Sequence, residues 1–193
     1  MKARGLLGLV LVLGLAASAR AQGLSLSLSA GVFAAGQETY REIYGPGLPV
    51  ALEGWLNFRG AFGLSAGVTW LRDDGSAVAV SGGGEQYPLR FERLTFPLTI
   101  FFAPRLKGLV LRLGAGLAFH SYREKWQTVD LGFEGTCLGP RVCAAVEVPI
   151  AGRLSLFGSL VYESIPTGVE YTRGERINLG GLQALGGVAF RVR

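Results

Sequence analysis

Apolar residues alternate with other residues along much of the chain, most clearly in two arms at 93–102 and 109–122. The apolar face of the first arm holds Leu94, Phe96, Leu98, Ile100 and Phe102, and that of the second holds Leu109, Leu111, Leu113, Ala115, Leu117 and Phe119. The opposite faces carry mainly small or polar residues. A period of two over such lengths predicts two long β-strands joined as a hairpin. An apolar face opposite a small, polar one is typical of a transmembrane β-barrel rather than of a soluble sandwich.

The same alternation recurs along the rest of the chain. It marks eight segments, at 24–35, 48–58, 62–72, 93–102, 109–122, 140–149, 153–163 and 177–193. The connections alternate between long stretches, at 36–47, 73–89, 123–138 and 164–176, and short turns. Outer-membrane barrels show this asymmetry, with long extracellular loops and short periplasmic turns. We therefore predict an all-β fold, an eight-stranded antiparallel up-and-down transmembrane β-barrel that leaves no unpaired backbone edge in lipid.

The first 21 residues have the pattern of a signal peptide. Lys2 and Arg4 precede an apolar core of about eleven residues, and Ala19-Arg20-Ala21 is a small-residue cleavage site. The core is short of the roughly 20 residues that a membrane-spanning helix needs. We expect residues 1–21 to be a signal peptide and 22–193 to be the outer-membrane barrel domain, which places the mature protein in the cell outer membrane.

The positive charge of the chain lies largely in this leader. The whole chain has a formal net charge of +5, and without Lys2, Arg4 and Arg20 the balance is 16 basic to 14 acidic residues. So small an excess does not argue for a nucleic-acid partner.

Charged residues in the middle of the predicted strands share the parity of the lumen face. They are Glu53, Arg93, Arg112, Arg141, Glu147 and Arg191. A charge buried in a narrow lumen must be paired or hydrogen-bonded, and eight strands leave just enough interior for side chains. We expect a lumen filled by a charge cluster, with a narrow channel for ions or small solutes as the alternative.

Cys137 and Cys143 are the two cysteines of the chain. Export to an oxidising compartment permits a disulfide, and Gly139-Pro140 between them could fold the chain back. The alternative is a pair of free thiols, one of them facing the lumen, because spacing alone does not determine the Cα separation. Two cysteines and one histidine form a poor ligand set, so neither a metal nor a cofactor is expected.

The predicted extracellular loops mix aromatic and basic residues. Tyr40, Tyr44, Arg123, Trp126 and Arg173 are the candidate interaction surface. Loops on a rigid scaffold often carry recognition, and these side chains suit anionic lipid head groups or surface glycans. The plainer interpretation is a solvated rim that reaches into the membrane interface.

Three short stretches resemble a known group of proteins. These are 40–45 (YREIYG), 94–98 (LTFPL), and 113–117 (LGAGL) with Tyr122. With them the mature chain resembles the small eight-stranded outer-membrane β-barrel proteins, the group of the OmpA transmembrane domain and OmpX. The resemblance implies outer-membrane lipids and the barrel-assembly machinery as partners. It departs from the group at the terminal Phe190-Arg191-Val192-Arg193, where such barrels usually end in an aromatic residue.

Two other interpretations remain. Some small barrels modify lipids with His and Ser near the extracellular rim, and His120-Ser121 lies at such a position. Adjacent strand residues point to opposite faces, however, which disfavours a histidine–serine contact, so we do not expect an enzyme. A soluble lipocalin-type barrel would instead turn the apolar faces inward. The function expected is a structural or adhesive one, exercised through the extracellular loops.

Overall fold

Eight long strands form one closed antiparallel barrel in the computed structural model, which describes residues 23–58, 61–78, 86–128, 131–170 and 176–192. The strands are β1 (Gly23–Ala35), β2 (Val50–Asn57), β3 (Phe62–Val78), β4 (Gln86–Phe102), β6 (Leu109–Trp126), β7 (Gly132–Ala151), β8 (Leu154–Glu163) and β11 (Gly181–Arg191). Four shorter elements lie between them: α2 (Glu38–Tyr44), β5 (Arg105–Leu106), β9 (Pro166–Glu170) and β10 (Arg176–Asn178).

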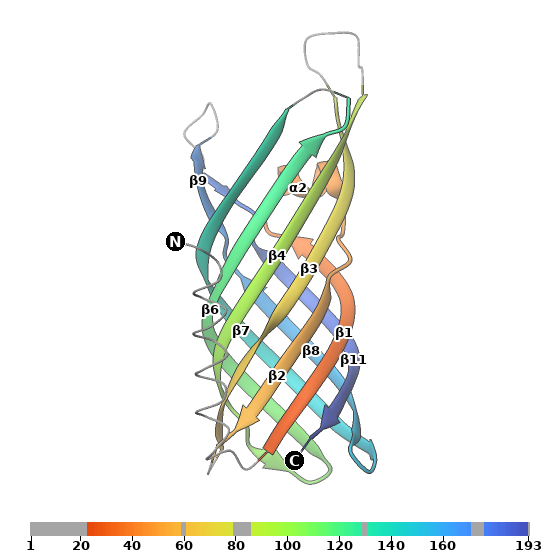
Figure 1. The fold of residues 1–193 in the computed structure, drawn as a ribbon, viewed down its shortest axis with the longest axis vertical. Coiled ribbons are helices and arrows are strands. Elements are labelled where there is room, and N and C mark those ends of the chain that lie inside the picture. Colours follow the sequence, from red (N-terminus) through yellow and green to blue (C-terminus); the bar gives the residue numbers. More distant parts are fainter. Residues whose placement is uncertain (1–22, 59–60, 79–85, 129–130, 171–175, 193) are drawn as a thin grey trace.

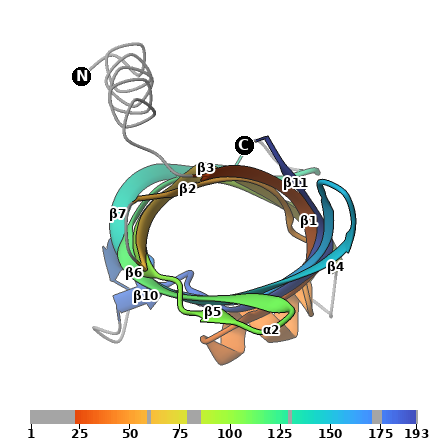
Figure 2. The ribbon, with the colours of Figure 1, turned by 90° about the horizontal axis from the view of Figure 1, so that it is seen from below.

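Each strand pairs with the neighbours that an up-and-down barrel requires. The order runs β4-β3-β2-β1-β11-β8-β7-β6, and pairing between β4 and β6 completes the circle. The first and last strands are joined by a continuous ladder, in which Leu28 lies opposite Val188. Figure 2 shows the resulting ring in a view from below. The predicted architecture is confirmed.

The two faces of the wall differ as the alternation predicts. Large apolar side chains are exposed on the outside, among them Leu28, Leu52, Leu98, Ile100, Leu117, Val142, Leu160 and Val188. The side chains between them point inward and are buried. In water this outer surface would be unfavourable at roughly 25 cal/mol per Å², whereas in a bilayer it matches the lipid chains. A soluble lipocalin would turn these large apolar side chains into its interior, whereas here they face outward.

The turns at one end of the barrel are short and include glycines in the left-handed region. Gly108 (φ 81°) lies between β5 and β6, and Gly152 (φ 54°) lies between β7 and β8. A positive φ is readily adopted only by glycine. The described C-terminal end of β11 lies at this same end (Figure 1), which is the periplasmic end by the usual loop asymmetry.

The opposite end is more ordered than the sequence pattern predicts. Strands β3, β4, β6 and β7 run on through much of 73–89 and 123–138, which the pattern assigns to loops. Their ladders continue because opposite charges face each other across the strands, as at Arg72 and Glu92 or Arg123 and Glu134. We call the part of this sheet beyond the register of Trp70, at 71–78, 86–93, 122–126 and 132–135, the extracellular extension; these strand ends form the upper end of the barrel in Figure 1.

Two further departures concern the other long connections. Residues 36–47 contain the helix α2, and 164–176 contain the hairpin β9–β10, a two-stranded sheet separate from the barrel wall. No helix among the described residues is long and apolar enough to cross a bilayer. The predicted signal peptide and Arg173 lie outside the described residues.

Candidate functional site: the lumen and the extracellular mouth

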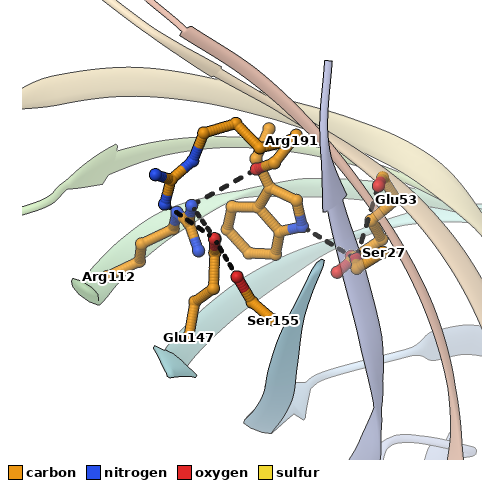
Figure 3. Close-up of polar contacts among 8 residues, drawn as sticks. Ser27, Glu53, Arg112, Glu147, Ser155 and Arg191 are labelled. Atoms are coloured by element: carbon orange, nitrogen blue, oxygen red, sulfur yellow. Dashed lines mark hydrogen bonds and ion pairs between the residues drawn. The ribbon is translucent and has the colours of Figure 1, made fainter. Parts of the chain in front are cut away.

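The lower lumen is filled by a cluster around Glu147, shown in Figure 3. Arg112 donates from Nη2 to Glu147 Oε2 at 2.6 Å, and Arg191 donates to Oε1 at 3.1 Å. Ser155 Oγ also donates to Oε1, at 3.0 Å. The Arg112 guanidinium lies 5.1 Å from the ring centroid of Trp55. One carboxylate thus accepts three donors, which is how a buried charge is stabilised.

A second charge cluster lies nearer the extracellular end, around Arg141. Its Nη1 donates to Glu163 Oε1 at 2.8 Å, and its Nη2 pairs with Glu53 from β2. Gln183 donates to the other oxygen of Glu163 at 2.9 Å. Glu163 was missing from the set of lumen charges predicted from the sequence, although its parity in β8 assigns it to the inner face.

Aromatic side chains occupy the space beside these clusters. Trp55, Phe101 and Phe157 are buried, with ring centroids 5.4 Å and 5.7 Å from Trp55. The Trp55 indole donates from Nε1 to Ser27 Oγ at 3.0 Å, so its polar atom is satisfied. Charged and aromatic groups together fill the barrel interior.

Arg93 departs from the expectation that every lumen charge meets a carboxylate. It is 1 % exposed and donates from Nη1 to the Leu179 carbonyl at 3.0 Å. Its guanidinium lies 4.5 Å from the centroid of the Phe33 ring. Among the described residues it forms no ion pair, because its place on β4 sets it above both carboxylate clusters.

His120 is fully buried and is tied to the barrel wall. Its Nδ1 and Thr95 Oγ1 are 3.0 Å apart. Ser121 follows on the outer face of β6, as strand alternation requires. The two side chains therefore do not form a nucleophile–base pair.

The cysteines do not form a disulfide. Both thiols are free, with Cys143 buried and Cys137 half-buried. The sequence left open a bend at Gly139-Pro140, but β7 continues straight through it. Six residues of extended strand separate the two cysteines by about 20 Å, far beyond the reach of a disulfide.

The helix α2 fills the extracellular mouth and packs against the extension. Tyr40 donates its hydroxyl to Asp73 Oδ2 and Tyr44 donates to Glu124 Oε2, both at 2.7 Å. The rings of Tyr40 and Tyr44 are buried against Phe91. The prediction that these two tyrosines stand on an exposed loop surface is therefore wrong. Burying an aromatic ring is more favourable than leaving it in water, and the seven-residue helix α2 places both rings on its buried side.

Burial affects the titration of the Tyr40–Asp73 pair. Desolvation, with the charge of Asp73 beside it, raises the pKa of Tyr40 far above its ordinary value, so the hydroxyl stays protonated and able to donate. Desolvation also raises the pKa of Asp73, more than the Tyr40 hydrogen bond and Arg93 lower it.

The other two described residues of the predicted interaction surface lie on the extension. Arg123 is exposed and lies 3.7 Å from Glu134. Trp126 is half-buried and faces Tyr87, with ring centroids 5.9 Å apart. Among the described residues, no group of three or more His, Cys, Asp and Glu could hold a metal ion.

Beside α2 lies a cavity of about 210 Å³. Tyr40, Ile43 and Tyr44 line it from the helix, and Phe91, Glu124, Phe133, Ile177 and Leu179 line it from other parts of the chain. The sequence did not indicate this cavity, because helix, barrel wall and β9–β10 region meet there only after the barrel has closed.

Known proteins resemble this chain in fold but not detectably in sequence. No protein-family model matches it, and no curated protein matches it either. The crystal structure of OprG from Pseudomonas aeruginosa aligns with a TM-score of 0.68 at 7% identity, over 90% of this chain and 97% of that one. Neisserial surface protein A aligns with a TM-score of 0.60 at 13% identity, over 86% and 96%.

A major outer membrane protein from Thermus thermophilus aligns with a TM-score of 0.51 at 15% identity, over 87% of this chain and 98% of that one. Identities this low establish a common fold and nothing narrower. With its closed wall and apolar outer band, the chain is an integral outer-membrane β-barrel protein, one of the small eight-stranded barrels that share the fold of Neisserial surface protein A and OprG.

Proposed function

We propose that the protein is a non-conducting barrel with a structural or adhesive role, and that its extracellular extension is the surface that meets a partner. The proposal rests on two features that occur together: the lumen is filled, and an ordered, charged extension stands above the membrane. Outer-membrane lipids surround the barrel, and the barrel-assembly machinery inserts it.

The filled lumen argues against a channel. Arg141 bridges carboxylates from β2 and β8, so it ties opposite sides of the wall together across the interior. Each of these three side chains is about 2 % exposed or less. An ion would have to separate buried ion pairs in order to pass, at a cost of several kcal/mol.

The extension carries three cations close together on its outer face. Arg90 on β4 lies directly opposite Lys125 on β6, and Arg123 is two residues away on the same face. Like charges placed directly opposite each other destabilise a sheet. Asp74 accepts from Arg90 Nε at 2.8 Å, and Glu92 and Glu134 both lie opposite Arg123, so the repulsion that remains is mainly that between Arg90 and Lys125. The arrangement favours an anionic partner.

These three cations stand at a height above the apolar outer band that suits contact with a lipid head group or a surface glycan. Arg90 lies four residues beyond Leu94, the last apolar residue on the outer face of β4. For a strand tilted by about 40°, four residues rise about 10 Å along the barrel axis. Ail of Yersinia pestis, a barrel of the same fold with a TM-score of 0.50 and 9% identity, has been crystallised with the heparin analogue sucrose octasulfate.

Conductance tests the closed lumen. The purified protein in a planar bilayer should show no stepwise current over a range of salt concentrations and voltages. A variant in which alanine replaces Arg141 as well as Trp55, Phe101 and Phe157 should open a path, and this variant shows that insertion and detection work. Stepwise current from the unaltered protein would instead establish a channel.

Binding tests the extension. Cells that display the protein should bind a sulfated polysaccharide or anionic lipid vesicles, and Arg90→Gln/Arg123→Gln/Lys125→Gln should lose most of this binding. The matched control is Lys107→Gln/Arg153→Gln, which removes cations from the periplasmic turns. Equal binding by both variants would contradict the proposal. A changed lipid profile on deleting the protein, reproduced in His120→Ala, would indicate a lipid-modifying enzyme.

A further inference from the structure

Aromatic rings form much of the wall of the mouth cavity. Four aromatic rings border its volume of about 210 Å³, those of Tyr40, Tyr44, Phe91 and Phe133. The rings belong to α2, β4 and β7, three elements that meet at the upper end of the barrel (Figure 1). A space of this size holds a small organic molecule but not a polymer.

Three of the rings form a corner rather than a parallel stack. Tyr40 and Phe91 are nearly perpendicular, at 88° with centroids 5.3 Å apart. Tyr44 is tilted against both, at 39° to Tyr40 and 50° to Phe91. Rings that meet at steep angles can present π-electron density to one point from several sides, which is how aromatic cages hold alkylammonium groups.

The charge at the cavity is negative. Glu124 is the charged residue in its lining, and its Oε2 accepts the Tyr44 hydroxyl at 2.7 Å. The hydroxyl of Tyr40 is likewise held by a carboxylate, that of Asp73. The nearby cation, Arg93, is not part of the lining: its Nη1 donates to the Leu179 carbonyl and its guanidinium stacks over Phe33.

We propose that this cavity binds a small organic cation, an alkylammonium or quaternary ammonium group, through the corner of Tyr40, Tyr44 and Phe91 and the carboxylate of Glu124. The rings attract the cation through cation–π interactions, and the carboxylate of Glu124 neutralises its charge. The purely apolar residues Ile43, Ile177 and Leu179 contact the carbon substituents of the cation. Binding also joins α2 to β4 and β6, so it holds the helix in place. This inference is independent of the proposed adhesive role.

Calorimetry with matched probes tests the site. The folded protein is titrated in a sugar-head-group detergent, because a phosphocholine detergent carries the cation in question. The probes are choline, its neutral carbon isostere 3,3-dimethyl-1-butanol, and the anion 3,3-dimethylbutyrate. Choline should bind roughly three- to thirtyfold more tightly than the neutral isostere, the range expected from cation–π attraction.

Two variants identify the groups responsible. Phe91→Leu keeps an apolar side chain but removes a ring, and Glu124→Gln keeps the shape but removes the charge. Each should weaken choline binding by part of that preference and leave the affinity for the neutral isostere unchanged. Phe101→Leu, in the lower lumen, is the matched control and should bind choline like the unaltered protein.

Each contrary outcome overturns the inference. Equal affinity for choline and the isostere would show a purely apolar cavity, and tighter binding of the anion would show that Arg93 governs it. No binding of choline to folded protein, or unchanged binding in both Phe91→Leu and Glu124→Gln, would exclude the cation site. Protection of the α2 amides from hydrogen exchange on adding choline provides a second readout.

Discussion

Arg141 on β7 lies directly opposite Glu163 on β8 and donates to its carboxylate at 2.8 Å. The same guanidinium reaches Glu53 on β2, so one side chain neutralises two carboxylates from different parts of the wall. Arg141 thus links β7, β8 and β2 across the barrel interior at this level.

Replacing that arginine should therefore be costly. Arg141→Ala leaves two buried carboxylates without their partner, and we expect the free energy of unfolding to fall by about 3–5 kcal/mol. Denaturant titration in lipid vesicles, followed by tryptophan fluorescence, measures this change. Arg123→Ala is the control: its 3.7 Å pair with Glu134 is exposed, and its loss should cost less than about 1 kcal/mol. Equal losses would show that the lumen pairs stabilise no more than surface pairs.

A larger side chain should reduce the stability of the barrel at one of two neighbouring glycines in β11 and not at the other. A Cβ at Gly187 would lie 2.1 Å from the Leu28 carbonyl oxygen, whereas a Cβ at Gly186 would have nothing within 4 Å. Gly187→Val should thus destabilise the barrel by about 1–3 kcal/mol or prevent closure, and Gly186→Val should fold normally. The heat-shifted gel mobility of folded barrels reports the folded fraction. Similar mobility and stability of both variants would contradict the inward placement of Gly187.

The cysteines should both react as thiols. Protein denatured without a reductant should take up an alkylating reagent at Cys137 and at Cys143, because β7 holds them about 20 Å apart. Mass spectrometry counts the labels. Unlabelled protein that gains two labels only after reduction would demonstrate a disulfide.

The docking of α2 should depend on pH through Asp73. Burial raises the pKa of this carboxyl in the folded protein above its unfolded value, so the folded state binds the proton more tightly. The resulting stabilisation is complete below the unfolded pKa and is lost as the pH rises through the folded pKa.

Hydrogen exchange of the α2 amides, corrected for the intrinsic rate, should therefore show less protection above that pH. Asp73→Asn should remove this dependence. Asp74→Asn is the control, because Asp74 is largely exposed and Arg90 lowers its pKa. A pH dependence that persists in Asp73→Asn would assign it to another group.

Much of the barrel follows from alternation. A strand in lipid must present apolar side chains to one side, so the parity of Leu28 or Leu160 and the inward place of Arg112 can be read directly. The extracellular ends of the strands could not be predicted in this way. The extension has charged residues on its outer face, so its sequence resembles that of a loop. The disulfide question was open for a related reason: Gly139-Pro140 suggests a turn, yet ladder pairing of β7 with β6 on one side carries the strand through it.

By itself, the sequence determined the alternation of faces, the number of long strands and the identity of most groups in the lumen, because these depend on local periodicity and on the exclusion of charge from lipid. Only the tertiary structure decided which charges meet. Arg141 pairs with Glu53 and Glu163, whereas Arg93 donates to the Leu179 carbonyl and stacks on the Phe33 ring. Barrel closure and strand stagger decide this, because they set the position of each side chain along the barrel axis. The same closure turned Tyr40 and Tyr44 from expected surface residues into the wall of a cavity, because a helix folded into the mouth buries the rings that a free loop would expose.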